Sequence, residues 1–415
     1  MGFRAAAANV LLAAGTTVTL LLAGEGALRL SGYAPAGFQH TNRIANRGRT
    51  VLLDCYPSNP RGYFDIDLHD PATLERYRAL GLARLEDAAR HTPFAVERRY
   101  SAQQFRSPEI GPKRPGVVRV AVIGDSFTEG MGVKEEDAYP RVLHRLLNTG
   151  AEEGHWEVLN CGRRGYDFPA LFDLFEAVLA FEPDIVVYGM VLNDAVKTEA
   201  FEARQAYLND WILDRGRMFR EGEEPRQRPF DLRLLAFLRD RYEAYRIGRD
   251  TTRWYHDMYG EANREGWERT QALLRDMNQQ ARAGGRRFLI ASWPLLVGLE
   301  GRYPFADVSE TIGRFCLSAG IPRHDLLAAL YGRPADSLWV HPVDHHPSEV
   351  AHRLAAESLV PAVRRLRVDE PIPEEDGPRV SPAPPISGAG PGPRAPVASV
   401  APPAGPARPA PSPRP

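Results

Sequence analysis

From Val117 onward, short and almost wholly apolar runs alternate with segments of helical periodicity, and this alternation constrains the fold more than any other feature. The apolar runs are VVRVAVIG, WEVLNCG, DIVVYGMV and RFLIASW, and each has the length of a buried strand. Strands that are apolar on both sides belong to parallel sheets covered by helices on both faces. The sequence therefore predicts an α/β fold with a parallel sheet.

The segments between these runs are predicted to be helices. Apolar residues fall on one helical face after each of the first two runs, namely Val142, Leu143, Leu146 and Leu147, then Leu171, Leu174, Phe175 and Val178. Further helices are expected over 268–285, 308–320 and 348–366. We place the main domain at 116–368, interrupted by a polar, helical insertion at about 195–260. Two interpretations of the insertion remain open, a cap over a substrate and a solvated helical insertion.

The N-terminus carries an uncharged apolar segment, Ala5 to Ala23, preceded by Arg4. At about 1.5 Å per residue this segment approaches the roughly 30 Å of a bilayer core. A cleaved signal peptide and a buried soluble helix are the alternatives, but no clear A-x-A cleavage site follows. We interpret residues 1–23 as a signal anchor or transmembrane helix, and residues 24–115 as a membrane-proximal extension packed on the main domain.

The C-terminal residues 369–415 consist largely of Pro, Ala, Gly and Arg. Such a segment buries too little apolar surface to offset the entropy of ordering, which predicts a disordered tail. The formal net charge is −1, so the chain as a whole has no basic bias toward nucleic acid. Its cysteines, Cys55, Cys161 and Cys316, form no CxxC pair, which excludes zinc-ribbon and thioredoxin-like motifs.

Polar clusters follow the first three predicted strands and precede the last helix. They read GDSFTEG, NCGRRGYD, YGMVLND and HPVDHHPS. In an open parallel sheet, reacting groups collect at the carboxyl ends of the strands. Nucleophilic serine chemistry needs a base, a group that orients the base and donors for the oxyanion, and these clusters contain such residues. For the Ser126 turn, simple turn chemistry and phosphate binding are alternatives, although neither usual phosphate-loop pattern occurs.

These clusters resemble motif blocks of the SGNH (GDSL) hydrolases, a family of serine esterases and acyl hydrolases. GDSFTEG resembles the first block, NCGRRGYD the second, GMVLND the third and VDHHPSEVAHRLAA the fifth, in family order from Val117 to Leu366. The resemblance implies a flavodoxin-like three-layer α/β/α sandwich. The apolar start running into GEGALRL also resembles bacterial members anchored in the cell envelope.

The resemblance also implies roles for individual residues. Ser126 would be the nucleophile, His346 the base and Asp344 the carboxylate that orients the base. The backbone N–H groups of Ser126 and Gly165 and the side-chain amide of Asn193 would form the oxyanion hole.

Two spacings depart from the family pattern. The usual G-x-N-D is longer here, because Gly189 stands four residues before Asn193. The usual D-x-x-H is shorter, because Asp344 stands two residues before His346. This D-x-H spacing is similar to that of alginate O-acetyltransferase-like members, which keeps acyl transfer open. His345 is the other candidate base.

The predicted function is hydrolysis of O-acyl esters by a membrane-anchored domain outside the cytoplasm, in the periplasm or on the cell surface, without a metal or organic cofactor. Acylated polysaccharides and lipids are the candidate substrates, and no nucleic acid is expected to bind. Asp125 and Asp194 are assigned to hydrogen bonds that support the turns. Two alternatives are an O-acyltransferase or deacetylase of envelope or exported polysaccharide, and a catalytically idle membrane-anchored scaffold.

Overall fold

A computed structural model describes residues 2–31, 64–66, 95–97, 100–204, 232–341 and 344–367. Most of the predicted extension, the centre of the insertion and the whole C-terminal tail lie outside these residues, so those predictions stay predictions.

The central sheet has five parallel strands in the order β4-β3-β5-β6-β7. They are β3 (Val118–Gly124), β4 (Trp156–Gly162), β5 (Ile185–Met190), β6 (Arg287–Ser292) and β7 (Arg323–Asp325). Numbered along the chain, this is the flavodoxin-like order 2-1-3-4-5, with β3 as the first strand. The first four strands occupy the predicted apolar runs. The prediction of a parallel sheet is confirmed.

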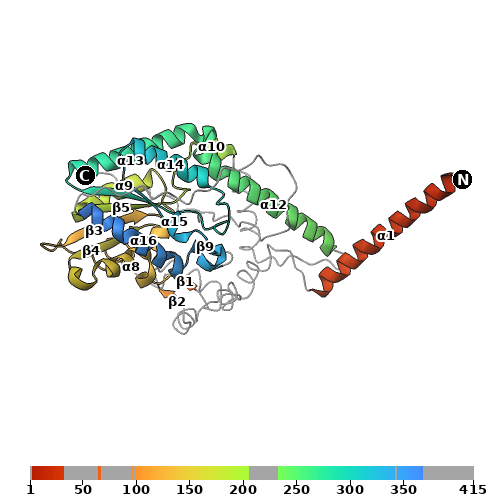
Figure 1. Cartoon of the computed structure of the whole chain (residues 1–415), viewed down its shortest axis with the longest axis horizontal. Coiled ribbons are helices and arrows are strands. Elements are labelled where there is room, and N and C mark those ends of the chain that lie inside the picture. The colour runs from red at the N-terminus through yellow and green to blue at the C-terminus, as the bar shows by residue number, and fades with distance from the viewer. Residues whose placement is uncertain are drawn as a thin grey trace, which may run out of the picture.

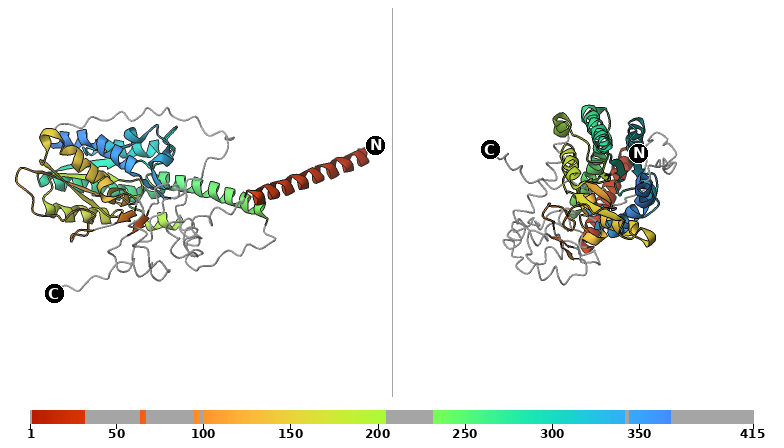
Figure 2. Two further views of the ribbon diagram at one scale, coloured as in Figure 1. Left: turned by 90° about the horizontal axis from the view of Figure 1, so that it is seen from below. Right: turned by 90° about the vertical axis from the view of Figure 1, so that its left-hand side faces the viewer.

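Helices cover both faces of this sheet (Figures 1 and 2). The main-domain helices are α7 (Ser126–Glu129), α8 (Tyr139–Leu147), α9 (Ala170–Val178), α13 (Arg264–Ala283), α14 (Ala306–Ser318), α15 (Leu327–Leu330) and α16 (Glu349–Arg367). Short 3₁₀ turns are η2 (Glu135–Asp137), η3 (Gly150–Glu152), η4 (Leu179–Phe181), η5 (Glu261–Asn263) and η6 (Ala335–Leu338). Helices α8 and α16 pack together on one face, and α9 and α13 on the other. The result is the expected three-layer sandwich.

The core lies between the sheet and these two helix layers. Six of the seven residues of β3 and all six of β5 are buried, as strands covered on both faces must be. The described end of the predicted extension contributes to this core, because Phe105 is buried and its ring meets that of Phe181 edge to face at 6.0 Å.

Two smaller strand pairs flank the main sheet. The short parallel strands β1 (Phe64–Ile66) and β2 (Ala95–Glu97) pair with each other. The antiparallel strands β8 (Trp339–His341) and β9 (Asp344–Pro347) form a hairpin immediately before α16. This hairpin carries the HPVDHHPS cluster.

The N-terminal helix α1 spans Gly2–Leu30, so it continues through GEGALRL beyond the apolar segment (Figure 1). An ion pair between Glu25 and Arg29, one turn apart at 2.7 Å, supports this continuation. Within α1, the segment Ala8–Leu30 is long and apolar enough to cross a membrane, a property that signal sequences share.

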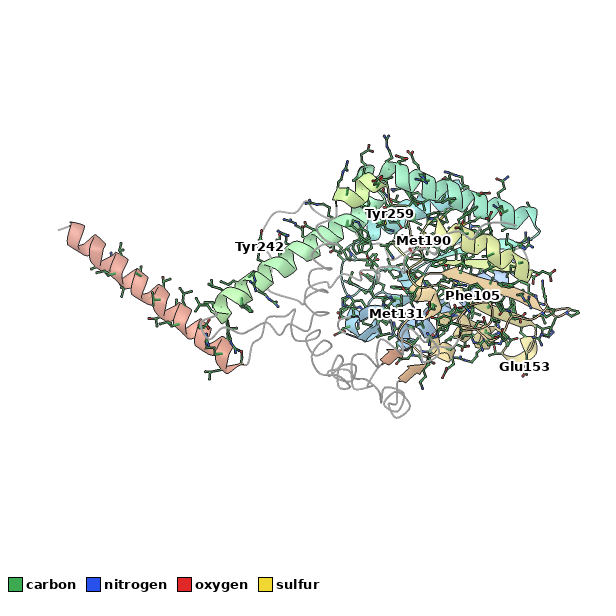
Figure 3. The ribbon with its side chains drawn as sticks, turned by 180° about the vertical axis from the view of Figure 1, so that it is seen from behind. Phe105, Met131, Glu153, Met190, Tyr242 and Tyr259 are labelled. Atoms are coloured by element: carbon green, nitrogen blue, oxygen red, sulfur yellow. The ribbon has the colours of Figure 1, made fainter. Side chains whose placement is uncertain are left out.

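The described parts of the insertion are helical. They are α10 (Glu199–Arg204) and the 26-residue α12 (Arg233–Met258). Figures 1 and 3 show that the first part of α12 reaches beyond the main domain and meets the C-terminal end of α1.

Candidate active site

Ser126 lies at the carboxyl end of the central strand β3. Strand β3 ends at Gly124, and α7 begins at Ser126 itself. Asp125 caps this helix, because its carboxylate accepts a hydrogen bond from the backbone N–H of Phe127 at 2.8 Å. Ser126 is the one residue from Ala121 to Gly130 that is not buried. Its hydroxyl is therefore held rigidly and can still be reached.

The imidazole of His346 contacts this hydroxyl. Nε2 of His346 lies 2.9 Å from Oγ of Ser126, although the two residues are 220 positions apart in the chain. The His346 side chain is only 5% exposed. Its ring packs against Phe127, with centroids 5.5 Å apart and planes inclined by 58°. A serine hydroxyl within hydrogen-bond reach of a buried imidazole is the arrangement of an activated nucleophile and its base.

The neighbouring His345 is engaged elsewhere. Its ring stacks on Trp339 across the β8–β9 hairpin, at 3.8 Å between centroids and 15° between planes. Of the two candidate bases, His346 is the one in contact with Ser126. Asp344 begins β9, but its side chain lies outside the part of the molecule that the structure describes.

The sheet register brings the Ser126, Gly165 and Asn193 loops to one edge. Gly124, at the end of the central strand β3, pairs with Gly162 of β4 on one side and with Gly189 of β5 on the other. The loops that follow these three glycines therefore leave the sheet side by side. They carry all three residues that the sequence assigns to the oxyanion hole.

Hydrogen bonds and a backbone conformation fix the loop after β4. The N–H of Arg163 donates to the carbonyl of Gly124 at 2.9 Å, and the N–H of Phe168 donates to the carbonyl of Asp194 at 2.9 Å. Gly165 adopts φ +75°, which favours glycine. The Gly165 loop is thus tied to both the Ser126 loop and the Asn193 loop.

Glu129, which the sequence analysis did not single out, holds the same loop from the serine side. Its carboxylate accepts from the backbone N–H of Arg164 at 2.9 Å, from the Arg164 guanidinium at 2.6 and 2.9 Å, and from the Tyr100 hydroxyl at 2.9 Å. The Glu129 side chain is 3% exposed. A Cβ on Gly162 would come within 2.2 Å of the Glu129 nitrogen, so α7 and the end of β4 are in direct backbone contact. Arg164 immediately precedes Gly165, and the carboxylate therefore orients the peptide next to the predicted oxyanion donor.

The two carboxylates assigned to the turns are both buried. Burial raises the pKa of Asp125 to about 6, against the opposing effects of the Phe127 N–H and the nearby charge of His346. Burial, followed by the charge of Asp125, raises the pKa of Asp194 well above its usual range. Asp194 accepts from the Tyr188 hydroxyl at 2.7 Å and from the Val191 N–H at 2.9 Å. The Asp125 carboxylate thus bonds within its own turn, and the Asp194 carboxylate joins its loop to strand β5.

A third histidine, His352 in α16, is a neutral ring that connects to the helix of Ser126. Burial lowers the pKa of His352 to about 3. Its Nδ1 accepts from the Tyr139 N–H at 3.2 Å, and the Tyr139 hydroxyl lies 3.0 Å from Oγ1 of Thr128. Helices α16 and α8 are in this way linked to the serine helix. No group of three or more His, Cys, Asp or Glu side chains suited to a metal ion occurs among the described residues.

The sequence matches a known family over more than half of the chain. The profile of the GDSL-like lipase/acylhydrolase family aligns with residues 122–354, from β3 through the first turns of α16. The chain belongs to this family. The resemblance to SGNH/GDSL hydrolases drawn from the four clusters is confirmed, and the match places the chain among ester-bond hydrolases.

Individual SGNH/GDSL relatives are distant. An acetylxylan esterase of Xylanibacter ruminicola is 27% identical over 184 residues, which cover 42% of this chain and 32% of that protein. An acetylxylan esterase from Geobacillus stearothermophilus is 15% identical, with a TM-score of 0.37 over 61% of this chain and 95% of that structure. A G-D-S-L family protein described as lipolytic, from Desulfitobacterium hafniense, is 18% identical, with a TM-score of 0.34 over 59% and 98%.

Proposed function

We propose that this SGNH/GDSL protein hydrolyses O-acyl esters through an acyl-enzyme formed on Ser126. The observation that carries the proposal is the 2.9 Å contact between Ser126 Oγ and His346 Nε2. As the hydroxyl attacks the ester carbonyl, His346 takes its proton, and it then gives that proton to the departing alcohol. Water attacks the acyl-enzyme in the second half of the reaction, again with His346 as the base. The carboxylic acid leaves, and Ser126 regains its proton.

Asp344 is proposed to orient His346. It lies two residues before His346 in β9, which is the spacing of residues on one face of a strand. A carboxylate bound to Nδ1–H would keep Nε2 free to accept the serine proton and would stabilise the imidazolium that forms.

The oxyanion is proposed to be held by the backbone N–H groups of Ser126 and Gly165 and by the amide of Asn193. The register that sets their loops side by side supports this assignment. Donors fixed before the reaction stabilise the developing charge without reorganisation. Since Glu129 fixes the Gly165 loop, we propose that it is a positioning residue for this hole.

Replacing Glu129 by glutamine is expected to lower kcat by about 10²-fold with little change in KM, because a small displacement of a donor is costly only in the transition state. A neutral amide also cannot accept from all the Arg164 donors at once. The measurement is steady-state kinetics on p-nitrophenyl acetate.

Glu157→Gln is the matched control, because Glu157 pairs with the buried Arg119 at 2.7 Å near the start of β4, away from the site. It is expected to lower thermal stability and leave kcat unchanged. A Glu129→Gln protein that loses stability in the same way but keeps kcat within about twofold would show that Glu129 has only a structural role.

The class of ester is proposed from the family and the relatives. The curated relative is named an acetylxylan esterase, which favours acetylated polysaccharide as the substrate class. The helix Ala8–Leu30 supports a membrane anchor. An acetylated polysaccharide substrate would require the catalytic domain to lie outside the cytoplasm.

The deciding experiment uses the full chain in detergent micelles with p-nitrophenyl acetate and acetylated xylan. The proposal predicts release of p-nitrophenol and of acetate above the buffer rate, together with labelling by a fluorophosphonate probe. If the folded protein neither released these products nor reacted with the probe, the idle scaffold would be favoured. Acetyl transfer to an added sugar in preference to water would favour the acyltransferase.

A further inference from the structure

The two halves of α12 have different surroundings. Its C-terminal half packs into the main domain, where Tyr255 and Met258 are buried. Its N-terminal half exposes large apolar and tyrosine side chains. The exposed fractions are 61% for Leu235, 52% for Leu238, 63% for Tyr242 and 66% for Tyr245, and Leu232 just before the helix is 53% exposed. Figure 3 shows Tyr242 on the part of α12 that extends beyond the main domain toward α1.

These exposed residues form one stripe. Successive members from Leu235 to Tyr245 are three or four positions apart, the spacing of neighbours on one helix face. Isolated exposed leucines need no explanation, but a continuous stripe marks a surface that meets something apolar.

The stripe begins where the candidate membrane helix ends. The carboxylate of Glu25, in α1, accepts from the backbone N–H groups of Arg233 at 3.1 Å and Leu234 at 2.8 Å. It therefore satisfies the first donors of α12 and places a negative charge at that helix N-terminus, where it is favourable. The contact holds the start of α12 at the C-terminal end of Ala8–Leu30. At about 1.5 Å per residue, Tyr245 lies within roughly 20 Å of this point along α12.

The composition of this half of α12 fits a lipid headgroup layer. Between Arg233 and Tyr245 the helix has three arginines and two acidic residues. Arg246 and Arg249, the latter paired with Asp250, follow within the next turn, so the balance is positive. Tyrosine is enriched at membrane–water interfaces, and arginine-rich amphipathic helices lie on anionic lipid surfaces. A second copy of this chain is less favoured, because the stripe spans only about two heptads and isolated helices this short pair weakly.

We propose that the N-terminal half of α12, Arg233–Tyr245, lies on the anionic surface of the membrane that α1 spans, with the Leu235–Tyr245 stripe at the headgroup boundary. This inference rests on the proposed membrane anchor and not on the ester chemistry. In this proposal, α12 keeps the catalytic domain close to the bilayer surface.

The test uses the full chain in nanodiscs with one nitroxide spin label at a time. Cys55, outside the described residues, is first replaced by serine, while Cys161 and Cys316 are buried. Labels are placed at Tyr242→Cys and, as a matched control, at Leu317→Cys, which is 65% exposed on α14. In discs containing phosphatidylglycerol, the label at 242 is expected to collide several-fold more with dissolved oxygen than with a water-soluble nickel chelate. The label at 317 is expected to favour the nickel chelate.

Three outcomes would overturn the proposal. Equal behaviour of both labels would mean that α12 stands in water. Protection of label 242 from both reagents with dipolar broadening would assign the stripe to a second copy of this chain, and protection without broadening would assign it to this chain's own remaining residues. A third label at Gly15→Cys reports whether α1 spans the disc, and p-nitrophenyl acetate hydrolysis by the same sample reports the ester chemistry separately.

Discussion

Ser126→Ala is expected to reduce p-nitrophenyl acetate hydrolysis by about 10⁵-fold. Alanine has no nucleophilic oxygen, so the acyl-enzyme cannot form, and the His346 ring has no proton to accept. The measurement is p-nitrophenol release under substrate saturation, with fluorophosphonate labelling followed by mass spectrometry of the modified residue.

Ser309→Ala is the matched control for this substitution. Ser309 also carries a hydrogen-bonded hydroxyl, donating to Asp325 at 2.6 Å, but Ser309 lies on α14 and Asp325 on the edge strand β7, which β5 and β6 separate from β3. It is expected to keep full activity and full labelling. If the Ser126→Ala protein hydrolysed the ester at the wild-type rate, the acyl-enzyme mechanism would be wrong.

The second large effect is expected to distinguish the functions of two adjacent histidines, His345 and His346. His346→Ala removes the imidazole that lies 2.9 Å from Ser126 and should lower kcat by about 10⁵-fold. Added imidazole should restore part of this activity, because a free base can occupy the vacated space. His345→Ala should instead change kcat less than about tenfold, since it removes a ring that stacks on Trp339. The measurement is kcat for both variants, with and without imidazole.

A reversed result would reassign the base. Loss of activity in His345→Ala with retention in His346→Ala would contradict the proposed mechanism. Thermal unfolding of both variants measures the loss of packing separately from the loss of activity, because His345 stacks on Trp339 and His346 packs against Phe127.

The sequence predicted four of the five strands of the central sheet, β3 to β6, because each is a mostly apolar run. The edge strand β7 was missed, since Arg323–Asp325 consists of three polar residues whose pairing with β6 comes from tertiary contact. The β8–β9 hairpin was missed for a similar reason, because β9 reads DHHP and has no strand periodicity. Local patterns therefore identify the apolar strands of this fold and miss its short polar strands.

The sequence singled out the site residues Ser126 and His346 only through their family motifs. Their contact joins positions 220 residues apart, and no local pattern encodes such a distance. The sequence favoured His346 over His345 because the family's fifth block ends in His-Pro before a helix, and in the structure His346 contacts Ser126 while His345 stacks on Trp339. Glu129 was overlooked because its partner Arg164 belongs to another strand's loop. An acidic residue one turn after the nucleophile, together with arginines beside the predicted oxyanion glycine, is the signal that could have found it.

The burial of His346 also bears on whether the acyl group is released to water or transferred to another hydroxyl. One side of the imidazole is covered by Phe127, and only 5% of the residue meets solvent, while Ser126 is the sole accessible position in its turn. The incoming water of the second step is therefore expected to follow the path vacated by the first alcohol. In the proposed mechanism, the hydroxyl that reaches the acyl-enzyme first, from water or from a neighbouring sugar, determines whether the acyl group is hydrolysed or transferred.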